Sequence, residues 1–246
     1  MPAAYEIVDV EPDVFLVHGP HVNWVVLTEG TDVTLVDAGY PADAPAVIAS
    51  LAEIGARTGA VDLRAVLLTH AHGDHIGGLG EVVAARAGAP AVLTGADEVG
   101  HVRRDFLHQV TLAQVMEHAD DPRVMRWADA AVAAGGLRAE GYPDVRAHAM
   151  DSPLDVPGRP VPHATPGHTL GHTSYAIPRL GLVISGDALV TGHPTSAVEG
   201  PQQLARMFHR DAARADAAFR ELLALPSGTR VLPGHGRLAT LGAPGA

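Results

Sequence analysis

The segment His70-Ala71-His72-Gly73-Asp74-His75 constrains the fold of this chain more than any other part of the sequence. It follows the short apolar run 65–69, which is typical of a buried strand, and it precedes a helical pattern over about 79–87. Four polar side chains therefore fall on a turn between a strand and a helix. In α/β proteins, functional groups gather at such turns, beyond the carboxyl ends of the strands. The sequence thus predicts a ligand-binding loop inside an α/β fold.

Three later segments repeat this arrangement: each is a turn close after a strand-like run, with glycine beside the polar residue. They are TPGH with His168, SGD with Asp187 and PGHG with His235. Glycine lets the backbone approach a crowded site. The chain has no cysteine, so nitrogen and oxygen alone would bind a metal, and histidine with aspartate suits zinc, iron or manganese. The repeated pattern predicts a metal site.

Hydrophobic periodicity predicts two strand-rich halves, each followed by helices. The first half has strands at 5–10, 14–18, 23–28, 33–37 and 65–69, with helices at 41–57 and 79–87, and the stretch 96–141 is mainly helical. The second half has strands at 146–150, 161–164, 173–177, 182–185 and 230–232, with a helix at 202–225. We therefore expect two sheets packed face to face with helices outside.

Length and charge limit the classes of protein and of partner. The 246 residues suit one domain spanning 1–246, in which the helical stretch 96–141 is inserted as a cap. The net charge is −11 and all 17 basic residues are arginine, so nucleic acid is not an expected partner and lysine chemistry is excluded. The chain shows no export signal and no span of about 18 apolar residues. We expect a cytoplasmic protein that acts on a small molecule, without membrane binding.

The four motifs together resemble the metallo-β-lactamase superfamily, whose signature HxHxDH matches His70 to His75. His168, Asp187 and His235 follow in the order shown by the dinuclear members of that family, and the resemblance covers about 23–236. It implies an α/β fold: a four-layer αββα sandwich of two mixed β-sheets flanked by helices. It also implies two divalent metal ions, for which zinc is the first expectation and iron or manganese would serve.

The resemblance also implies a role for each ligand. His70, His72 and His168 would bind one metal, Asp74, His75 and His235 would bind the other, and Asp187 would bridge them. A hydroxide between the two ions would be the nucleophile, because a metal lowers the pKa of bound water from 15.7 to about 7. Asp74 would orient that hydroxide and pass a proton to the leaving group.

Five further residues are weaker candidates, and each has a simpler explanation. Asp37, in VDAG, would hydrogen-bond the ligand loop, or it would only cap a turn. His172 would support the ligands without binding metal, or it would only pack. Trp127 and Met116, in the cap, would line a pocket for an apolar acyl or ring group, or they would only hold the cap in place. His193 would face the substrate, or it would lie in an ordinary exposed loop.

Differences from known subfamilies narrow the expected reaction. Lactamases with a cysteine ligand are excluded, and all-histidine lactamases generally lack a counterpart of Asp187. Glyoxalase II shares the ligand set but adds a helical domain for glutathione that has no counterpart in these residues. Quorum-sensing lactonases use a substrate-side tyrosine, for which Tyr175, within a strand, is no match. The acidic charge disfavours the transfer-RNA nucleases.

We therefore predict a dinuclear metal-dependent hydrolase that cleaves an ester, thioester or lactone. Two alternatives stay open: a phosphodiesterase, and a metal-bound scaffold without turnover. The intact ligand set argues against the scaffold. Neither the substrate nor the oligomeric state follows from the sequence, because this fold hosts many chemistries.

Overall fold

The structure is a computed structural model that describes residues 5–86, 88–138 and 140–243. Its strands are β1 Glu6–Glu11, β2 Val14–His18, β3 Asn23–Glu29, β4 Asp32–Val36, β5 Asp62–Leu67, β6 Ala91–Thr94, β7 Arg146–Ala147, β8 Val161–Ala164, β9 Thr173–Ile177, β10 Leu182–Gly186, β11 Arg230–Pro233 and β12 Ala239–Thr240. Its α-helices are α1 Ala44–Thr58, α2 Gly73–Ile76, α3 Leu79–Ala84, α4 Val99–Arg103, α5 Leu112–Met116, α6 Pro122–Ala133 and α7 Ala212–Leu223. Short 3₁₀ turns are η1 Pro41–Asp43, η2 Ala96–Glu98, η3 Pro178–Leu180 and η4 Arg206–Phe208.

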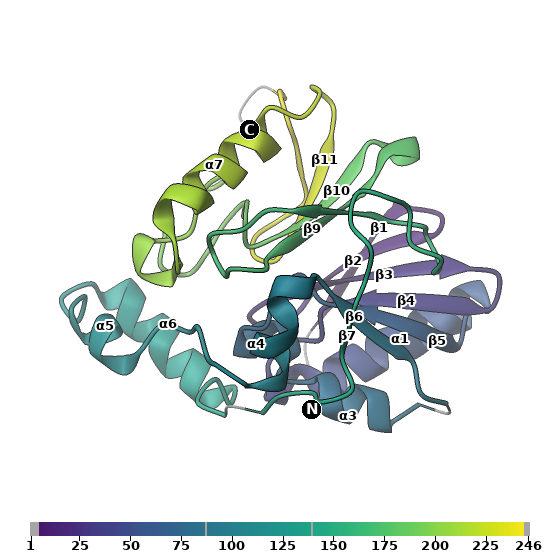
Figure 1. Ribbon diagram of the computed structural model, residues 1–246, viewed down its shortest axis with the longest axis horizontal. Coiled ribbons are helices and arrows are strands. Elements are labelled where there is room, and N and C mark those ends of the chain that lie inside the picture. The colour runs from purple at the N-terminus through teal and green to yellow at the C-terminus, as the bar shows by residue number, and fades with distance from the viewer. Residues whose placement is uncertain (1–4, 87, 139, 244–246) are drawn as a thin grey trace.

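The strands form two mixed sheets, as the sequence predicts. The first sheet has the order β1-β2-β3-β4-β5-β6-β7, in which β1 to β4 are antiparallel neighbours and β4 to β7 are parallel. The second has the order β12-β11-β10-β9-β8, in which only the pair β10 and β11 is parallel. Figure 1 shows the two sheets stacked, with α1 and α3 outside the first and α7 outside the second. The predicted four-layer αββα sandwich is confirmed.

The alternation of side chains along the strands explains this layering, because successive residues of a strand face opposite sides of its sheet. On one face of the first sheet, Phe15, Val17, Trp24, Val26, Leu35 and Val66 pack in one cluster with residues of α1 and α3. On the other face, Val14, Leu16, Val25, Leu27, Val36 and Leu67 pack against Tyr175, Ile177, Leu182, Ile184 and Leu232 of the second sheet. A third cluster joins Val183 and Val231 to Leu222 of α7.

Three predicted elements differ from the structure. The helix predicted at 202–225 begins only at Ala212, because the Asp211 carboxylate caps it by accepting hydrogen bonds from the backbone N–H groups of Ala213 and Arg214. Gln202 instead pairs with Val190 in an isolated β-bridge. The strand predicted at 146–150 is only two residues long, and the helix predicted at 79–87 ends at Ala84, with Ala87 itself outside the described residues.

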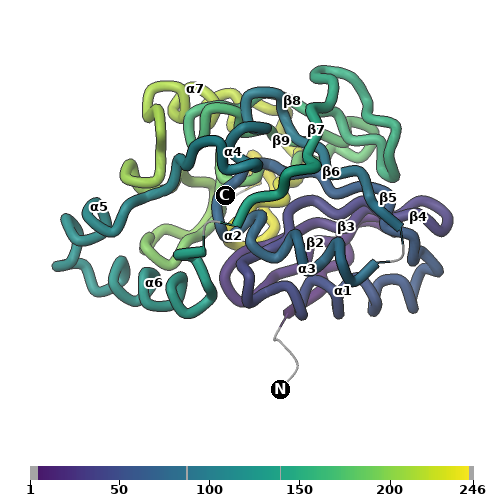
Figure 2. The backbone as a smooth tube through the Cα atoms, turned by 60° about the horizontal axis from the view of Figure 1, so that its bottom comes forward, coloured from purple at the N-terminus to yellow at the C-terminus, as the bar shows by residue number. Residues whose placement is uncertain are grey.

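The stretch 96–141 is broken into η2, α4, α5 and α6, with irregular segments between them. In Figure 2, α5 and α6 extend away from the two sheets on one side of the molecule. Their position relative to the ligand residues is described below. Among the described residues, no helix combines the length and the apolar character needed to cross a bilayer.

Candidate metal centre

All seven predicted ligands lie near the carboxyl ends of strands or in the loops between them. His70, His72, Asp74 and His75 come from the turn after β5 and from α2, which follows it. His168 lies in the loop between β8 and β9, Asp187 directly follows β10, and His235 lies two residues after β11. Because the two sheets are stacked, these loops meet at one edge of the sandwich. The fold thus brings together residues up to 165 positions apart in sequence, as the separation of His70 and His235 shows.

The seven side chains form two groups, and within each group the ligand atoms all lie within 4.8 Å of one another. His70, His72 and His168 form the first group, and Asp74, His75, Asp187 and His235 form the second. Asp187 lies between them. Its Oδ2 is 3.5 Å from His168 Nε2 and 3.4 Å from His235 Nε2, while its Oδ1 is 3.4 Å from His75 Nε2. Asp187 therefore contacts both groups, in the position that a bridging ligand would need.

The outer ring nitrogens of three histidines are held by hydrogen bonds, which leave the inner nitrogens facing the cluster. His75 Nδ1 donates to Asp37 at 2.8 Å, His235 Nδ1 to the carbonyl of His21 at 3.0 Å, and His72 Nε2 to the carbonyl of His108 at 2.6 Å. A carbonyl or an ionised carboxylate can only accept, so each of these bonds places a proton on the outer ring nitrogen. Such outer partners are typical of metal-binding histidines.

Unpartnered polar atoms in the centre of the cluster indicate that it fits a cation. His75 Nε2 and Asp187 Oδ1 are buried and lie 3.4 Å apart, and neither has a hydrogen-bond partner among the described residues. Leaving such groups unpaired costs about 1–3 kcal/mol each. A metal ion would compensate His75 Nε2 and Asp187 Oδ1 directly, since both belong to the contacts between ligand atoms.

The pKa values of the cluster depend on burial and on the two carboxylates. Burial lowers the pKa of His70 and His168 well below its ordinary value and that of His72 to about 4, so these imidazoles are neutral. Burial also lowers the pKa of His235, but the carboxylates of Asp187 and Asp74 outweigh it and raise this pKa to about 10. Without a cation, the second group therefore holds protons between its carboxylates, and a bound metal would replace them.

The glycine before His235 is required by this crowding. A Cβ atom on Gly234 would lie 2.2 Å from Asp187 Oδ1 and 2.9 Å from the His75 ring. No side chain can be accommodated there without displacing two predicted ligands. The glycine of the PGHG segment thus serves the close approach that its sequence suggested.

The structure places Asp37 and His172 directly behind the ligands. Asp37 adopts a left-handed backbone conformation, with φ of 63°, and its carboxylate accepts hydrogen bonds from the backbone N–H and hydroxyl of Thr69 and from His75. His172 Nε2 accepts a hydrogen bond from the backbone N–H of Asp187 at 3.0 Å, so that nitrogen is occupied. Both residues contact ligands without offering an atom to the cluster.

Glu98 is a buried carboxylate that the sequence analysis missed. Its Oε1 accepts hydrogen bonds from the backbone N–H of Ala71 and from His101 Nδ1, and its Oε2 accepts them from the Thr169 hydroxyl and the Gly171 N–H. Burial raises its pKa, but these donors outweigh burial and lower it. Glu98 thereby ties the loop of His70 and His72 to the loop of His168. Its only sequence signal is an acidic residue in a short turn, which is a common surface feature.

We predict that Glu98→Gln lowers the melting temperature by about 5–15 °C, because the amide can accept at one oxygen only and must face donors with its nitrogen. Thermal denaturation followed by circular dichroism measures this effect. Glu81→Gln, on an exposed residue of α3, is the matched control and should change little. An unchanged melting temperature for Glu98→Gln would refute its connecting role.

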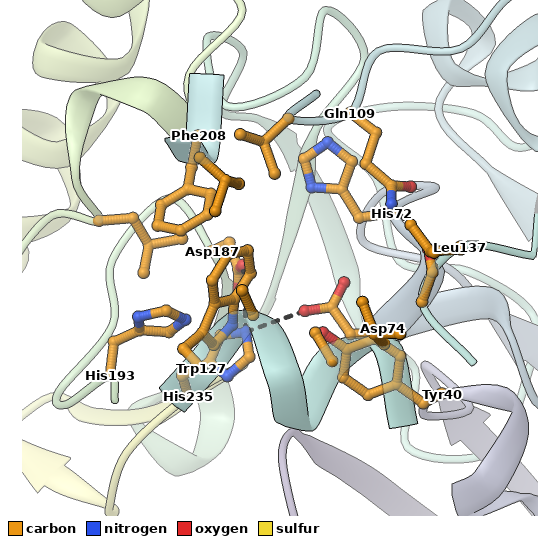
Figure 3. Close-up of a pocket in the computed structure, with 18 of the residues that line it drawn as sticks. Tyr40, His72, Asp74, Gln109, Trp127, Leu137, Asp187, His193, Phe208 and His235 are labelled. Carbon is orange, nitrogen blue, oxygen red and sulfur yellow. Dashed lines mark hydrogen bonds and ion pairs between the residues drawn. The ribbon is translucent and has the colours of Figure 1, made fainter. Parts of the chain in front are cut away.

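A pocket with largely apolar walls opens directly onto the cluster, and Figure 3 shows its lining. We call it the apolar pocket. Its floor contains His72, Asp74, His168, Asp187 and His235. Its walls include Val110, Leu112, Val115, Trp127, Ala128, Ala131, Val132 and Leu137 from the stretch 96–141, together with Leu204 and Phe208 from the segment before α7.

Of the three candidates for substrate binding, two line the apolar pocket and one does not. Trp127 and His193 line the apolar pocket, while Met116 is 52% exposed and does not line it. Tyr40, which the sequence analysis did not consider, also lines it and lies beside Asp74 in Figure 3. Burial, with Asp74 and Asp43 nearby, raises the pKa of the Tyr40 phenol, so it is protonated and can donate a hydrogen bond.

Comparisons with known proteins agree with this geometry. The sequence profile described as "Metallo-beta-lactamase superfamily" matches residues 19–235. A hydroxyacylglutathione hydrolase of Halorhodospira halophila is 30% identical over 213 residues, which are 87% of this chain and 61% of that protein. The chain thus spans about three fifths of the length of the first curated relatives it matches.

Solved structures give the same fold. A protein crystallised as TTHA1623 in a di-iron-bound form has a TM-score of 0.59 and 26% identity, covering 91% of this chain and 92% of that one. The BLEG-1 B3 metallo-beta-lactamase has a TM-score of 0.58 and 24% identity, covering 97% and 95%, a likeness of fold alone. From its profile match, its fold and its ligand motifs, the chain belongs to the metallo-beta-lactamase superfamily.

Proposed function

We propose that this protein is a dinuclear metal-dependent hydrolase that cleaves an ester, thioester or lactone bond of a small molecule. The observation that carries the proposal is the position of Asp187 between two groups of ligand atoms at the floor of the apolar pocket. A bond held in that pocket would lie directly above both groups. The family's hydroxyacylglutathione hydrolases, at about 30% identity, support a thioester or ester substrate.

The proposed ligands are those that the sequence suggests. His70, His72 and His168 would hold one ion, and Asp74, His75 and His235 the other, with Asp187 shared. Two bound ions would supply a polarised carbonyl and an activated water at neutral pH. Zinc is our first choice because neutral imidazole and carboxylate suit it, and the di-iron relative supports iron as the second.

Asp74 is the carboxylate best placed to move a proton. Its side chain is 16% exposed and lines the apolar pocket, whereas that of Asp187 is 3% exposed. Burial raises the pKa of Asp74, but His75 and His235 outweigh it and lower this pKa to about 2. The carboxylate is therefore ionised at neutral pH and would accept a proton from the attacking water at its oxygen, then deliver it to the leaving group.

His193 would act as a neutral hydrogen-bond donor in the pocket wall. Its Nδ1 accepts a hydrogen bond from the backbone N–H of Thr195, which places the ring proton on Nε2. Burial lowers the pKa of His193 to about 3, so the ring is neutral. In Figure 3 the ring lies beside His235 and faces the pocket. Its N–H would stabilise negative charge that develops on the substrate's carbonyl oxygen.

A substrate panel on metal-loaded protein tests the proposed function. It contains carboxylic esters, thioesters, lactones, phosphodiesters and a β-lactam. The expected result is turnover of one or more carboxylic substrates, lost on chelation and restored by metal. Turnover of phosphodiesters alone would replace the proposal by the phosphodiesterase alternative, and binding of metal without turnover of any class would favour the scaffold.

We predict about two metal ions per chain in protein purified without chelator, since both groups of ligands are complete. Elemental analysis by plasma mass spectrometry measures the ratio and the identity of the metal. His163→Ala, on an exposed histidine of β8 outside both groups, is the matched control and should keep the wild-type ratio. A reproducible ratio near one would refute the dinuclear site.

We predict that His193→Ala lowers kcat by about 10²-fold, because one hydrogen-bond donor to the developing oxyanion is lost. His193→Gln, which retains an N–H donor, should recover part of this loss. Steady-state kinetics of both variants on one substrate of the panel separate the effects. Equal losses in the two variants would mean that the ring acts through packing against Trp127 and Phe208 and not as a donor.

A further inference from the structure

A second pocket adjoins the apolar pocket and is also lined by residues of the cluster. It shares His72 and His168 with the apolar pocket, and it also shares Gln109, Val110 and Phe208, which therefore stand where the two pockets meet. We call it the basic pocket. Its remaining lining consists of Leu107, His108, Thr111, Gln114, Met207, His209 and Arg210.

The charge of the two pockets differs in kind. The apolar pocket contains no arginine, and its only carboxylates are the proposed ligands Asp74 and Asp187. Among the residues that only the basic pocket has, Arg210 is joined by three further side chains that can carry N–H groups, His108, Gln114 and His209, and no carboxylate lines this pocket. In a chain of net charge −11, a pocket lined without any acid beside a metal centre is a local reversal of charge.

Arg210 is available to a ligand. Its guanidinium forms no ion pair with the described carboxylates, and its side chain is exposed. Its backbone is anchored to the centre, because its N–H donates to the carbonyl of the ligand His168 at 3.0 Å. Asp211, next in sequence, uses its carboxylate to cap α7. The cation therefore lies in the basic pocket close to the proposed site of hydrolysis.

We propose that the substrate has an apolar half and an anionic half, joined by the bond that is cleaved. The apolar half occupies the apolar pocket beside Trp127 and Leu137, and a carboxylate or phosphate of the other half binds Arg210 in the basic pocket. This inference rests on the proposed hydrolase function. The chemistry of the two linings defines the substrate class. It is an ester or thioester of a medium-chain acyl group, and its alcohol or thiol part carries the anion.

Matched thioesters test the two halves separately. The acyl group is acetyl or hexanoyl, and the thiol is 3-mercaptopropionate or its uncharged amide. Wild type is expected to prefer hexanoyl to acetyl and the charged thiol to the amide. Hexyl thioesters of succinate and of succinamate place the anion on the acyl side instead and show which half is the acyl group. Hydrolysis of all of these with equal kcat/KM would overturn the inference while leaving the hydrolase function intact.

Arginine variants locate the anion. Arg210→Gln is expected to raise KM for the charged thioester about five- to tenfold and to leave the amide unchanged. Arg206→Gln, an exposed residue of the same loop outside both pockets, is the control and should change neither. Arg126 lies in another pocket, beyond Trp127. A KM effect in Arg126→Gln without one in Arg210→Gln would overturn the assignment.

A leucine variant tests the apolar half. Leu137→Ala is expected to lower the preference for hexanoyl over acetyl about three- to tenfold, with Leu223→Ala, an exposed leucine of α7, as the control. A binding measurement does not depend on turnover. For it, calorimetry follows binding of the S-heptyl thioether of 3-mercaptopropionate, which cannot be hydrolysed. Loss of this binding in Arg210→Gln and Leu137→Ala supports the inference even if the panel reveals another reaction. Wild-type binding in both variants would overturn it.

Discussion

Asp187→Ala is expected to lower kcat/KM on the order of 10³-fold or more and to reduce the metal content from about two ions per chain. The carboxylate contacts His168 and His235 through one oxygen and His75 through the other, so its removal affects both groups at once. Asp74, the other carboxylate among the predicted ligands, contacts His75 and His235, which both belong to its own group. The same substitution should leave the fold intact, since it removes a buried charge and not a core side chain.

Steady-state kinetics, elemental analysis and thermal denaturation of Asp187→Ala test this together. Asp155→Ala, in an exposed ion pair with Arg159, is the matched control and should resemble wild type in all three. Near-wild-type kcat in Asp187→Ala would exclude the shared-ligand role. A collapse of the melting temperature in the chelated variant would mean instead that Asp187 mainly holds the fold.

The ligand set could be predicted because its signals are local. Each ligand lies in a short turn next to a strand, with glycine nearby, and the strand positions follow from hydrophobic alternation. The four strand ends that carry these turns then meet, because two sheets bury their apolar faces by stacking on each other. The sequence therefore indicated the seven candidate residues, and the structure brings them together in two groups that could each hold a metal ion.

Glu98 and Tyr40 could not be predicted in the same way, because their roles depend on contacts between loops far apart in sequence. Glu98 contacts Ala71 and Thr169, which are 27 and 71 positions away. Tyr40 lines the pocket from the position directly before η1, which contacts α2. Neither residue belongs to a motif with a fixed spacing, so only the packed structure shows what each one contacts.

The helix predicted at 202–225 was too long for a different reason. Leu204 and Phe208 have the spacing of a helical apolar stripe, but in the structure they pack against Val190 and Trp127 from an irregular segment. Periodicity cannot separate these two outcomes. The difference matters for function, because the irregular segment supplies walls to both pockets and carries Arg210.

Asp74→Asn is expected to lower kcat about 10²- to 10⁴-fold while KM changes less than about threefold. Asparagine matches aspartate in size and keeps an oxygen toward His235, but it cannot accept a proton at neutral pH. A residue that acts on the proton only in the transition state affects kcat and leaves ground-state binding nearly unchanged.

Metal content distinguishes this role from simple loss of a ligand. If Asp74→Asn retains about two ions per chain and the loss falls on kcat, the carboxylate handles the proton. If one ion is lost, excess metal should restore the occupancy without restoring kcat, because the missing group is the proton acceptor. Recovery of kcat by added metal would show that Asp74 serves only as a ligand. In that case Tyr40, the other polar side chain beside Asp74 in the pocket, can supply a proton to the leaving group but cannot take one from water, since its raised pKa keeps it protonated.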